Sequence, residues 1–173
     1  MPQSPMRDIG PCSLNWKGAD LGESLGDVMF RPGYNFAQVK ENSKGDDSVD
    51  EILIGMPVEL ECPLTRFTMA ILASVTPGAS GSGTSGDTVT VRNAVGLSLY
   101  DIAGLMVVKP IVNGVASTDS SEWLYCFKAA PKPQPELVYN VDGQRVYLIV
   151  FKVFPVQAGA VHAGDYYRWG PAI

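Results

Sequence analysis

The chain has 173 residues, which suits one domain of ordinary size, and at that length folding can bury roughly 70% of the unfolded surface. Hydrophobic residues make up 46%, charged residues only 18%, and the formal net charge is −5. Binding to phosphates needs clusters of Lys and Arg. The acidic balance therefore argues against a dedicated nucleic-acid-binding surface.

Membrane, secreted and metal-binding classes are disfavoured by the same inspection. No apolar run approaches the roughly 18 residues of a membrane span, and residues 1–12 lack the apolar segment of a signal peptide. The cysteines Cys12, Cys62 and Cys126 are odd in number and widely spaced. They favour reduced thiols in a cytoplasm over a disulfide framework or a zinc site.

In chain order, the first predicted elements are short strands. Apolar and β-branched patterning places them at residues 13–16, 28–31, 34–40, 52–54 and 57–62. In the last of these, apolar residues alternate with Glu59 and Glu61, so one face meets a core and the other meets water. Residues 41–51 carry five acidic residues against one lysine and predict an exposed acidic loop.

One helix is predicted, at about residues 65–75. Apolar residues recur there with the 3.6-residue period, beginning at Leu64 and Phe67, with Thr65 as the N-cap and Pro77-Gly78 as the stop. No other segment predicts a helix. Residues 76–87 consist almost entirely of small residues and predict a flexible Gly/Ser-rich loop.

The second half again predicts strands, at residues 89–92, 105–109, 123–128, 137–140 and 143–154. Asp142-Gly143 is a turn signal between the last two. Residues 131–135 alternate proline with polar residues and predict a stiff connector. About ten strands with one helix predict a mainly β fold, an antiparallel sandwich or barrel with one flanking short helix, in a single domain over residues 1–173.

Catalytic and cofactor signals are weak. His162, the only histidine, lies among small residues typical of a turn, where a solvated role is favoured over a catalytic one. The sequence of residues 81–86 satisfies G-x-G-x-x-G, but a helix is expected before it and a strand after it, the reverse of a dinucleotide site. We therefore expect no catalytic residue, no cofactor and no metal.

Carbohydrate chemistry is the remaining alternative. A pair of carboxylates such as Glu59 and Glu61 can hydrolyse glycosides, although carboxylates on one strand face more often decorate a wetted surface. Trp123, Tyr125 and Trp169 could form a sugar-binding platform. Core filling and anchoring of the C-terminus are favoured over a sugar platform as the role of these aromatic residues.

The order of the motifs resembles the tail tube, or major tail, proteins of tailed bacteriophages. The matching segments are Gly10-Pro11-Cys12-Ser13-Leu14-Asn15-Trp16, then Asp50-Glu51-Ile52-Leu53-Ile54-Gly55 leading into a strand and the helix, and Asp142-Gly143-Gln144-Arg145 opening the strand that ends at Phe154-Pro155. In that family an acidic D-x-I-x-x-G turn precedes a strand and short helix, and a D-G-x-R hairpin comes later. The Gly/Ser-rich segment 76–87 is longer than the family pattern.

This resemblance implies a structural virion protein rather than an enzyme. Its protomer would be a β-sandwich that assembles into stacked hexameric rings with a β-barrel wall, and DNA would pass through the lumen without specific binding. The implied partners are further copies of the chain, a tape measure protein, a tail terminator and, in a contractile tail, a sheath. The implied location is the virion tail, after assembly in the host cytoplasm.

The residues suggest roles within such a tube. Glu59 and Glu61 are candidates to line the lumen, because a channel for a polyanion should be acidic or neutral; facing outer solvent or a neighbour's basic side chain is the alternative. Asp46, Asp47 and Asp50 of the acidic loop are candidates for inter-ring contact, as is the N-terminal arm, residues 1–12. A tube-end, neck or baseplate ring protein of the same fold, and a carbohydrate-binding module, remain alternatives.

Overall fold

The computed structural model describes residues 11–24, 27–40, 47–66, 68–81, 88–132 and 146–171. The strands are β1 (Cys12–Trp16), β2 (Ala19–Asp20), β3 (Glu23–Ser24), β4 (Met29–Pro32), β5 (Asn35–Lys40), β6 (Ser48–Gly55), β7 (Val58–Arg66), β8 (Ala79–Gly81), β9 (Val89–Val91), β10 (Gly104–Val112), β11 (Val115–Ala116), β12 (Leu124–Lys132), β13 (Tyr147–Val153) and β14 (Tyr167–Trp169). The helices are α1 (Met69–Val75) and α2 (Leu99–Ile102), with a 3₁₀ turn at Ser120–Glu122.

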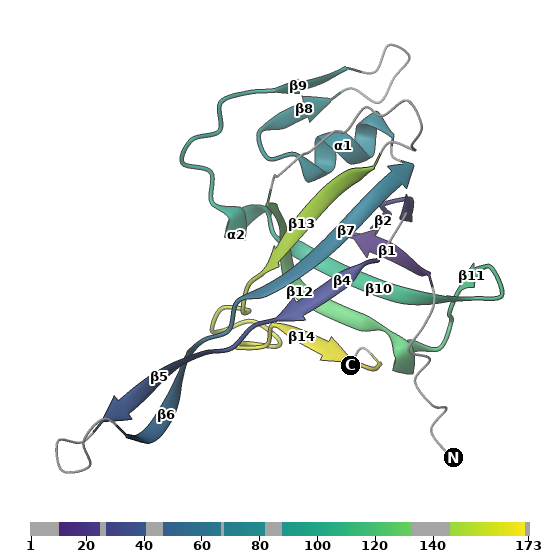
Figure 1. The fold of residues 1–173 in the computed structure, drawn as a ribbon. Helices are drawn as coiled ribbons and strands as arrows, with labels where there is room; N and C mark the ends of the chain where they lie inside the picture. The colour runs from purple at the N-terminus through teal and green to yellow at the C-terminus, as the bar shows by residue number, and fades with distance from the viewer. Residues whose placement is uncertain are drawn as a thin grey trace.

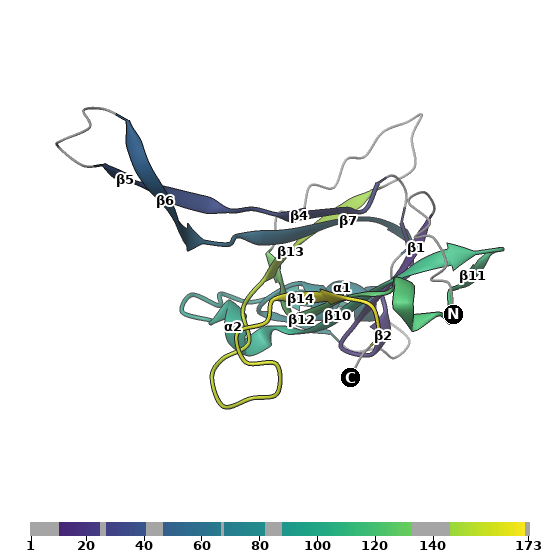
Figure 2. The same cartoon turned by 90° about the horizontal axis from the view of Figure 1, so that it is seen from below.

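A ten-stranded antiparallel sheet forms the body (Figure 1). Its main path is β2-β1-β10-β12-β13-β7-β3, and β4, β11 and β14 pair at the sides of β7, β10 and β12. Figure 2 shows that the sheet folds over itself, with β4 and β7 in one layer and β10, β12 and β14 in the other. The predicted mainly β class is confirmed.

The core lies between these two layers. β7 contributes Leu60, Cys62 and Leu64, all at most 1% exposed, and faces Leu14 and Trp16 of β1 among others. The Trp16 ring packs against Phe151 at 5.6 Å, and its Nε1 donates a buried hydrogen bond to the carbonyl of Ala129 at 2.9 Å. This bond satisfies the indole donor inside the apolar core and links β1 to β12.

The predicted helix at about residues 65–75 is present, but its predicted start was wrong. β7 continues to Arg66, and α1 begins at Met69 with Thr68 as N-cap, its hydroxyl accepting from the Ile71 N–H at 3.2 Å. Leu64 belongs to the strand because its side chain completes the apolar row that pairs with β13, opposite Tyr147. Helix α2 was not predicted; with four residues it is too short to show a period.

Three predicted loops also contain strand. In the acidic segment 41–51, the residues from Ser48 onward belong to β6. The Gly/Ser-rich segment 76–87 contains β8, which pairs with β9 and packs on α1. Pro131, expected in a connector, lies buried in β12 opposite Phe151. The predicted strand 137–140 and the Asp142-Gly143 turn lie outside the described residues.

The pair β5 and β6, named here the β5–β6 ribbon, extends away from the body as a two-stranded hairpin (Figures 1 and 2). It continues the direction of β4 and β7, and it pairs with no other described strand. Isolated two-stranded hairpins are marginally stable in water. The ribbon is therefore the part of the described fold with the least support from its own chain.

Candidate assembly interface

The predicted two-sidedness of β7 is present in the structure. Val58, Leu60 and Cys62 point into the core, while Glu59 and Glu61 occupy the opposite face and are half-buried. β4 runs along one side of β7 and β13 along the other, so both carboxylates lie near the middle of their layer. That this face lines a lumen stays a prediction.

Basic side chains balance these carboxylates. Arg31 Nη1 lies 3.1 Å from Glu61 Oε1, and Lys132 Nζ lies 3.7 Å from Glu59 Oε1. Lys152 sits opposite Glu59 in the β13–β7 register. The face therefore carries three cations for two carboxylates and is of mixed charge rather than acidic. Each pair retains solvent access, so each stabilises the fold by at most about 1 kcal/mol.

The sequence reasoning missed these cations because they belong to other strands. Arg31 is on β4, Lys132 at the end of β12 and Lys152 on β13. Only the alternation in 143–154, which places Lys152 opposite to Phe151 and Val153, hinted that a basic residue would share a sheet face with Glu59. The pairing partners depend on strand order, which the sequence does not state.

Of the predicted inter-ring residues, Asp47 directly precedes β6 and Asp50 lies near its start, where β6 pairs with the end of β5, and both are exposed. The Asp50 carboxylate accepts from the backbone N–H of Glu51 at 2.8 Å. Asp46 and residues 1–10 of the predicted N-terminal arm lie outside the described residues. The structure thus places two of the three acids on the most protruding described element.

Closer to the body, the same ribbon exposes large apolar side chains. Phe36 is 55% exposed, Ile52 54%, Leu53 45% and Ile54 67%. In the β5–β6 register Phe36 lies opposite Leu53, and Ala37 opposite Ile52, so apolar groups occupy both faces. Contiguous exposed apolar surface of this kind marks an interaction site.

Two strands, β4 and the start of β1, have backbone edges that no other described strand pairs. On β4, the bond from the Gly33 N–H to the Pro57 carbonyl fixes the register, and it turns the backbone groups of Phe30 away from β7. On β1, the hydrogen bond from the Ile111 N–H to the Pro11 carbonyl fixes the register with β10. This register turns the backbone N–H and carbonyl of Cys12 away from β10. Open edges are surfaces that pair readily with another chain.

The proposed sugar platform is not assembled. In the β12–β14 register Trp169 lies opposite Leu124, on the core-side face and 50% exposed, whereas Tyr125 is on the other face and 6% exposed. Trp123 has its ring covered by Lys109, whose Nζ lies 3.9 Å from the ring centroid. The three aromatic rings therefore do not share one exposed surface.

His162 occupies a turn, as the sequence suggested. Its φ is +68°, its ring stacks on Phe127 at 4.4 Å, and Nδ1 lies 3.5 Å from an Asp165 carboxylate oxygen. The segment that matches G-x-G-x-x-G begins at the end of β8, and the next described element is strand β9 rather than a helix. This context lacks the helix N-terminus that a dinucleotide phosphate needs.

The thiols of Cys62 and Cys126 are buried, and that of Cys12 is partly buried. Burial raises the pKa of Cys126 to about 12, and burial together with the nearby Cys12 and Cys126 raises the pKa of Cys62 well above its usual range. Burial also raises the pKa of the partly buried Cys12. All three are free thiols. These shifts disfavour thiolate chemistry near neutral pH.

The described ranges contain neither a candidate metal site nor a membrane-spanning helix. No three histidine, cysteine or carboxylate side chains there gather closely enough to hold a metal ion. Neither described helix has the length and apolar character of a membrane span. No protein-family model matches the chain, and no curated protein has significant similarity to it.

Proposed function

We propose that the protein is the structural subunit of a bacteriophage tail tube, in which stacked hexameric rings enclose a channel for DNA. The observation that carries the proposal is the β5–β6 ribbon, an apolar two-stranded extension that its own chain leaves uncovered. Such an element is stable when neighbours pack on it. The motif order that resembles tail tube proteins gives the kind of assembly.

The open strand edges support the same proposal. β1 lies near one end of the sheet path, and β4 lies near the other. An interface that joins two different edges is heterologous, and repetition of such an interface produces rings or filaments rather than closed pairs. A subunit of this design completes its sheet with strands from identical copies.

Charge fits a conduit through which DNA slides. The chain has a net charge of −5, so a ring of six carries about −30, and two of the three described cations on the face of Glu59 and Glu61 lie within ion-pair distance of those carboxylates. A phosphate backbone passing the described part of this wall meets one unbalanced lysine, Lys152, rather than a basic cluster that would hold it. In this proposal Glu59 and Glu61 line the channel, and Asp46, Asp47 and Asp50 contact the adjacent ring.

Negative-stain electron microscopy of the concentrated protein tests the proposal. We expect hollow tubes or stacked rings of uniform width. Short closed rings that do not extend would instead favour a tube-end, neck or baseplate subunit of the same fold. A protein that stays monomeric at millimolar concentration, in the presence and absence of salt, would contradict the proposal.

A further inference from the structure

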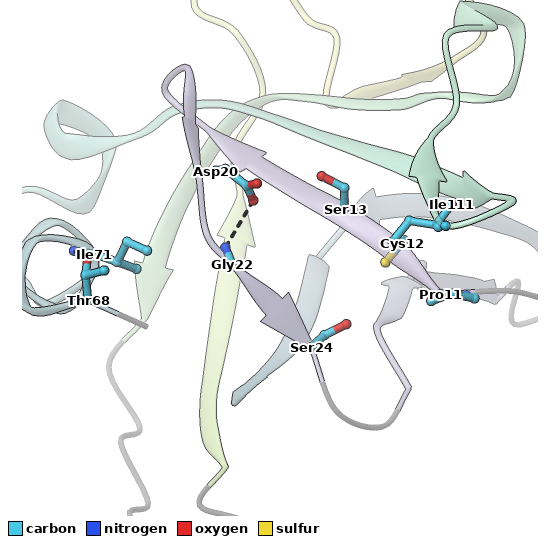
Figure 3. A pocket seen from close by; sticks show the side chains of 10 residues that line it. Pro11, Cys12, Ser13, Asp20, Gly22, Ser24, Thr68, Ile71 and Ile111 are labelled. Carbon is cyan, nitrogen blue, oxygen red and sulfur yellow. Dashed lines mark hydrogen bonds between the residues drawn. The ribbon is translucent and has the colours of Figure 1, made fainter. Parts of the chain in front are cut away.

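A groove of about 780 Å³ lies along the open edge of β1 (Figure 3). It forms where the chain leaves β1 and β2 and crosses at Gly22 to β3, which pairs with β7 of the other layer. The lining residues come from β1 and the residue before it, the β2–β3 connection, the start of α1 and the β10–β11 hairpin: Pro11, Cys12, Ser13, Asp20, Gly22, Ser24, Thr68, Ile71, Ile111 and Gly114. The groove is therefore an opening between the two layers of the sandwich.

At the start of β1, the backbone faces this groove with hydrogen-bonding groups that no described residue pairs. The register with β10 turns the N–H and carbonyl of Cys12 toward the open side, and β2 pairs only with Asn15 and Trp16. The Leu14 carbonyl already accepts from the Leu21 N–H at 2.9 Å. An extended segment laid beside Cys12 would continue the sheet by strand addition.

The walls select the kind of segment. Pro11, Ile71, Ile111 and the Cys12 thiol are apolar, Ser13, Ser24 and Thr68 add hydroxyl groups, and Asp20 carries the charged side chain of the lining. An acidic segment would be repelled by Asp20, and an uncharged apolar strand would be accepted. The run Ile52-Leu53-Ile54 of β6 is such a strand, since it is exposed and free of charge.

This run cannot reach the groove of its own chain. In both Figure 1 and Figure 2 the β5–β6 ribbon extends to the side of the body opposite β1 and β11. Donor and acceptor on opposite sides of one molecule meet only when a second copy is present, and the contact then repeats from copy to copy.

We propose that the groove beside β1 receives the apolar part of the β5–β6 ribbon of a second copy of this chain. The inference rests on the proposed function and adds to it the two surfaces that join. The acidic end of the ribbon, with Asp47 and Asp50, extends beyond the groove and away from Asp20.

The native thiols provide the first test. Cys12 lines the groove, whereas Cys62 and Cys126 are fully buried and serve as internal controls. A maleimide at pH 8.5 should label Cys12 in the dilute monomer and label it at least tenfold more slowly in assembled protein, with peptide mass spectrometry assigning the site. Equal labelling rates of Cys12 in the dilute monomer and in assembled protein would overturn the inference.

Cross-linking provides the second test. Ile54→Cys should form an intermolecular disulfide with Cys12 on mild oxidation of assembled protein, giving a ladder of dimers, trimers and larger species on non-reducing gels. The ladder should vanish when Cys12→Ser is added, and Val95→Cys, which is 93% exposed in the chain and lies outside the ribbon, should not produce it.

The outcomes separate the two proposals. Tubes that form normally while Cys12 stays reactive and no ladder appears would overturn the groove inference and leave the tail tube proposal intact. A chain that never assembles would overturn the tail tube proposal and the groove inference with it.

Discussion

Replacement of Ile54 by serine isolates the contribution of the ribbon to assembly. Ile54 is 67% exposed in the single chain. Complete burial of an aliphatic side chain contributes about 1.5–3 kcal/mol, so covering the exposed two-thirds contributes about 1–2 kcal/mol per subunit. We expect Ile54→Ser to raise the concentration at which half the protein assembles by about 5- to 30-fold.

The folded monomer should change much less, because only a third of this side chain is buried within it. Assembly is measured by pelleting and electron microscopy over a concentration series, and monomer stability by thermal melting at a concentration where nothing assembles. Val91→Ser is the matched control, since Val91 is 60% exposed on β9, outside the ribbon. Assembly of Ile54→Ser at the wild-type concentration, or an equal defect in Val91→Ser, would refute the reasoning.

Three further perturbations test the wall, the thiols and the helix start. Replacement of both Glu59 and Glu61 by lysine removes the two ion pairs and adds positive charge. We expect tubes of this variant to assemble and DNA ejection from particles to slow, with the double glutamine variant as control. Normal ejection would place these side chains away from the lumen. Above about pH 9 an unfolded thiol ionises while buried Cys126, with its pKa at about 12, stays neutral. The unfolded state then binds fewer protons than the folded state, so the free energy of unfolding falls by about 1.4 kcal/mol per pH unit between pH 9 and 12 from this group alone. Denaturant unfolding at several pH values should show a shallower decline in Cys126→Ala, and equal slopes would contradict the assignment. Thr68→Ala removes the N-cap acceptor of α1, so the free energy of unfolding should fall by about 1 kcal/mol and Tm by about 2–4 °C, whereas Thr68→Ser should keep both. Equal Tm values for the two variants would contradict the role of Thr68 as N-cap.

The strands that sequence reasoning placed well are those whose core contacts repeat with period two. In β7, alternate residues from Val58 to Leu64 are buried, and β13 presents Ile149, Phe151 and Val153 to the same core. Burial of one face leaves a pattern that can be read without knowledge of the partner strand. The mainly β class followed from several such segments.

The start of the helix was misplaced because one residue satisfied two periods. Leu64 is the last inward residue of β7 and also falls at helical spacing from Ile71. Leu64 joins the strand because it pairs with Tyr147 of β13, which is more than 80 positions away in the chain. A pattern read over a few neighbouring residues cannot contain this information.

Pro131 was assigned to a connector because proline removes a backbone donor. In the β12–β13 register the Pro131 nitrogen points away from β13, toward the side of β12 that pairs with β10. On that side β10 begins at Gly104, opposite Ala129, so β10 does not extend far enough to pair with Pro131. The missing N–H therefore costs no ladder bond. Only the strand order makes this position compatible with proline.

The candidate interface also has one part that the sequence predicts and another part that it does not. The acidic residues near Asp50 were recognisable from composition, but the groove beside β1 arises from the crossing of the chain between layers at Gly22. Its residues come from four separate parts of the chain and share no motif. Sequence reasoning had no signal by which to collect them.

Pro32 ends β4, and its nitrogen points to the unpaired side of that strand. An intruding chain that tried to extend the sheet there would find a carbonyl but no matching donor at this position. Any strand that pairs with β4 along this edge must tolerate one missing hydrogen bond at Pro32. The position therefore discriminates among the sequences that could extend the sheet there.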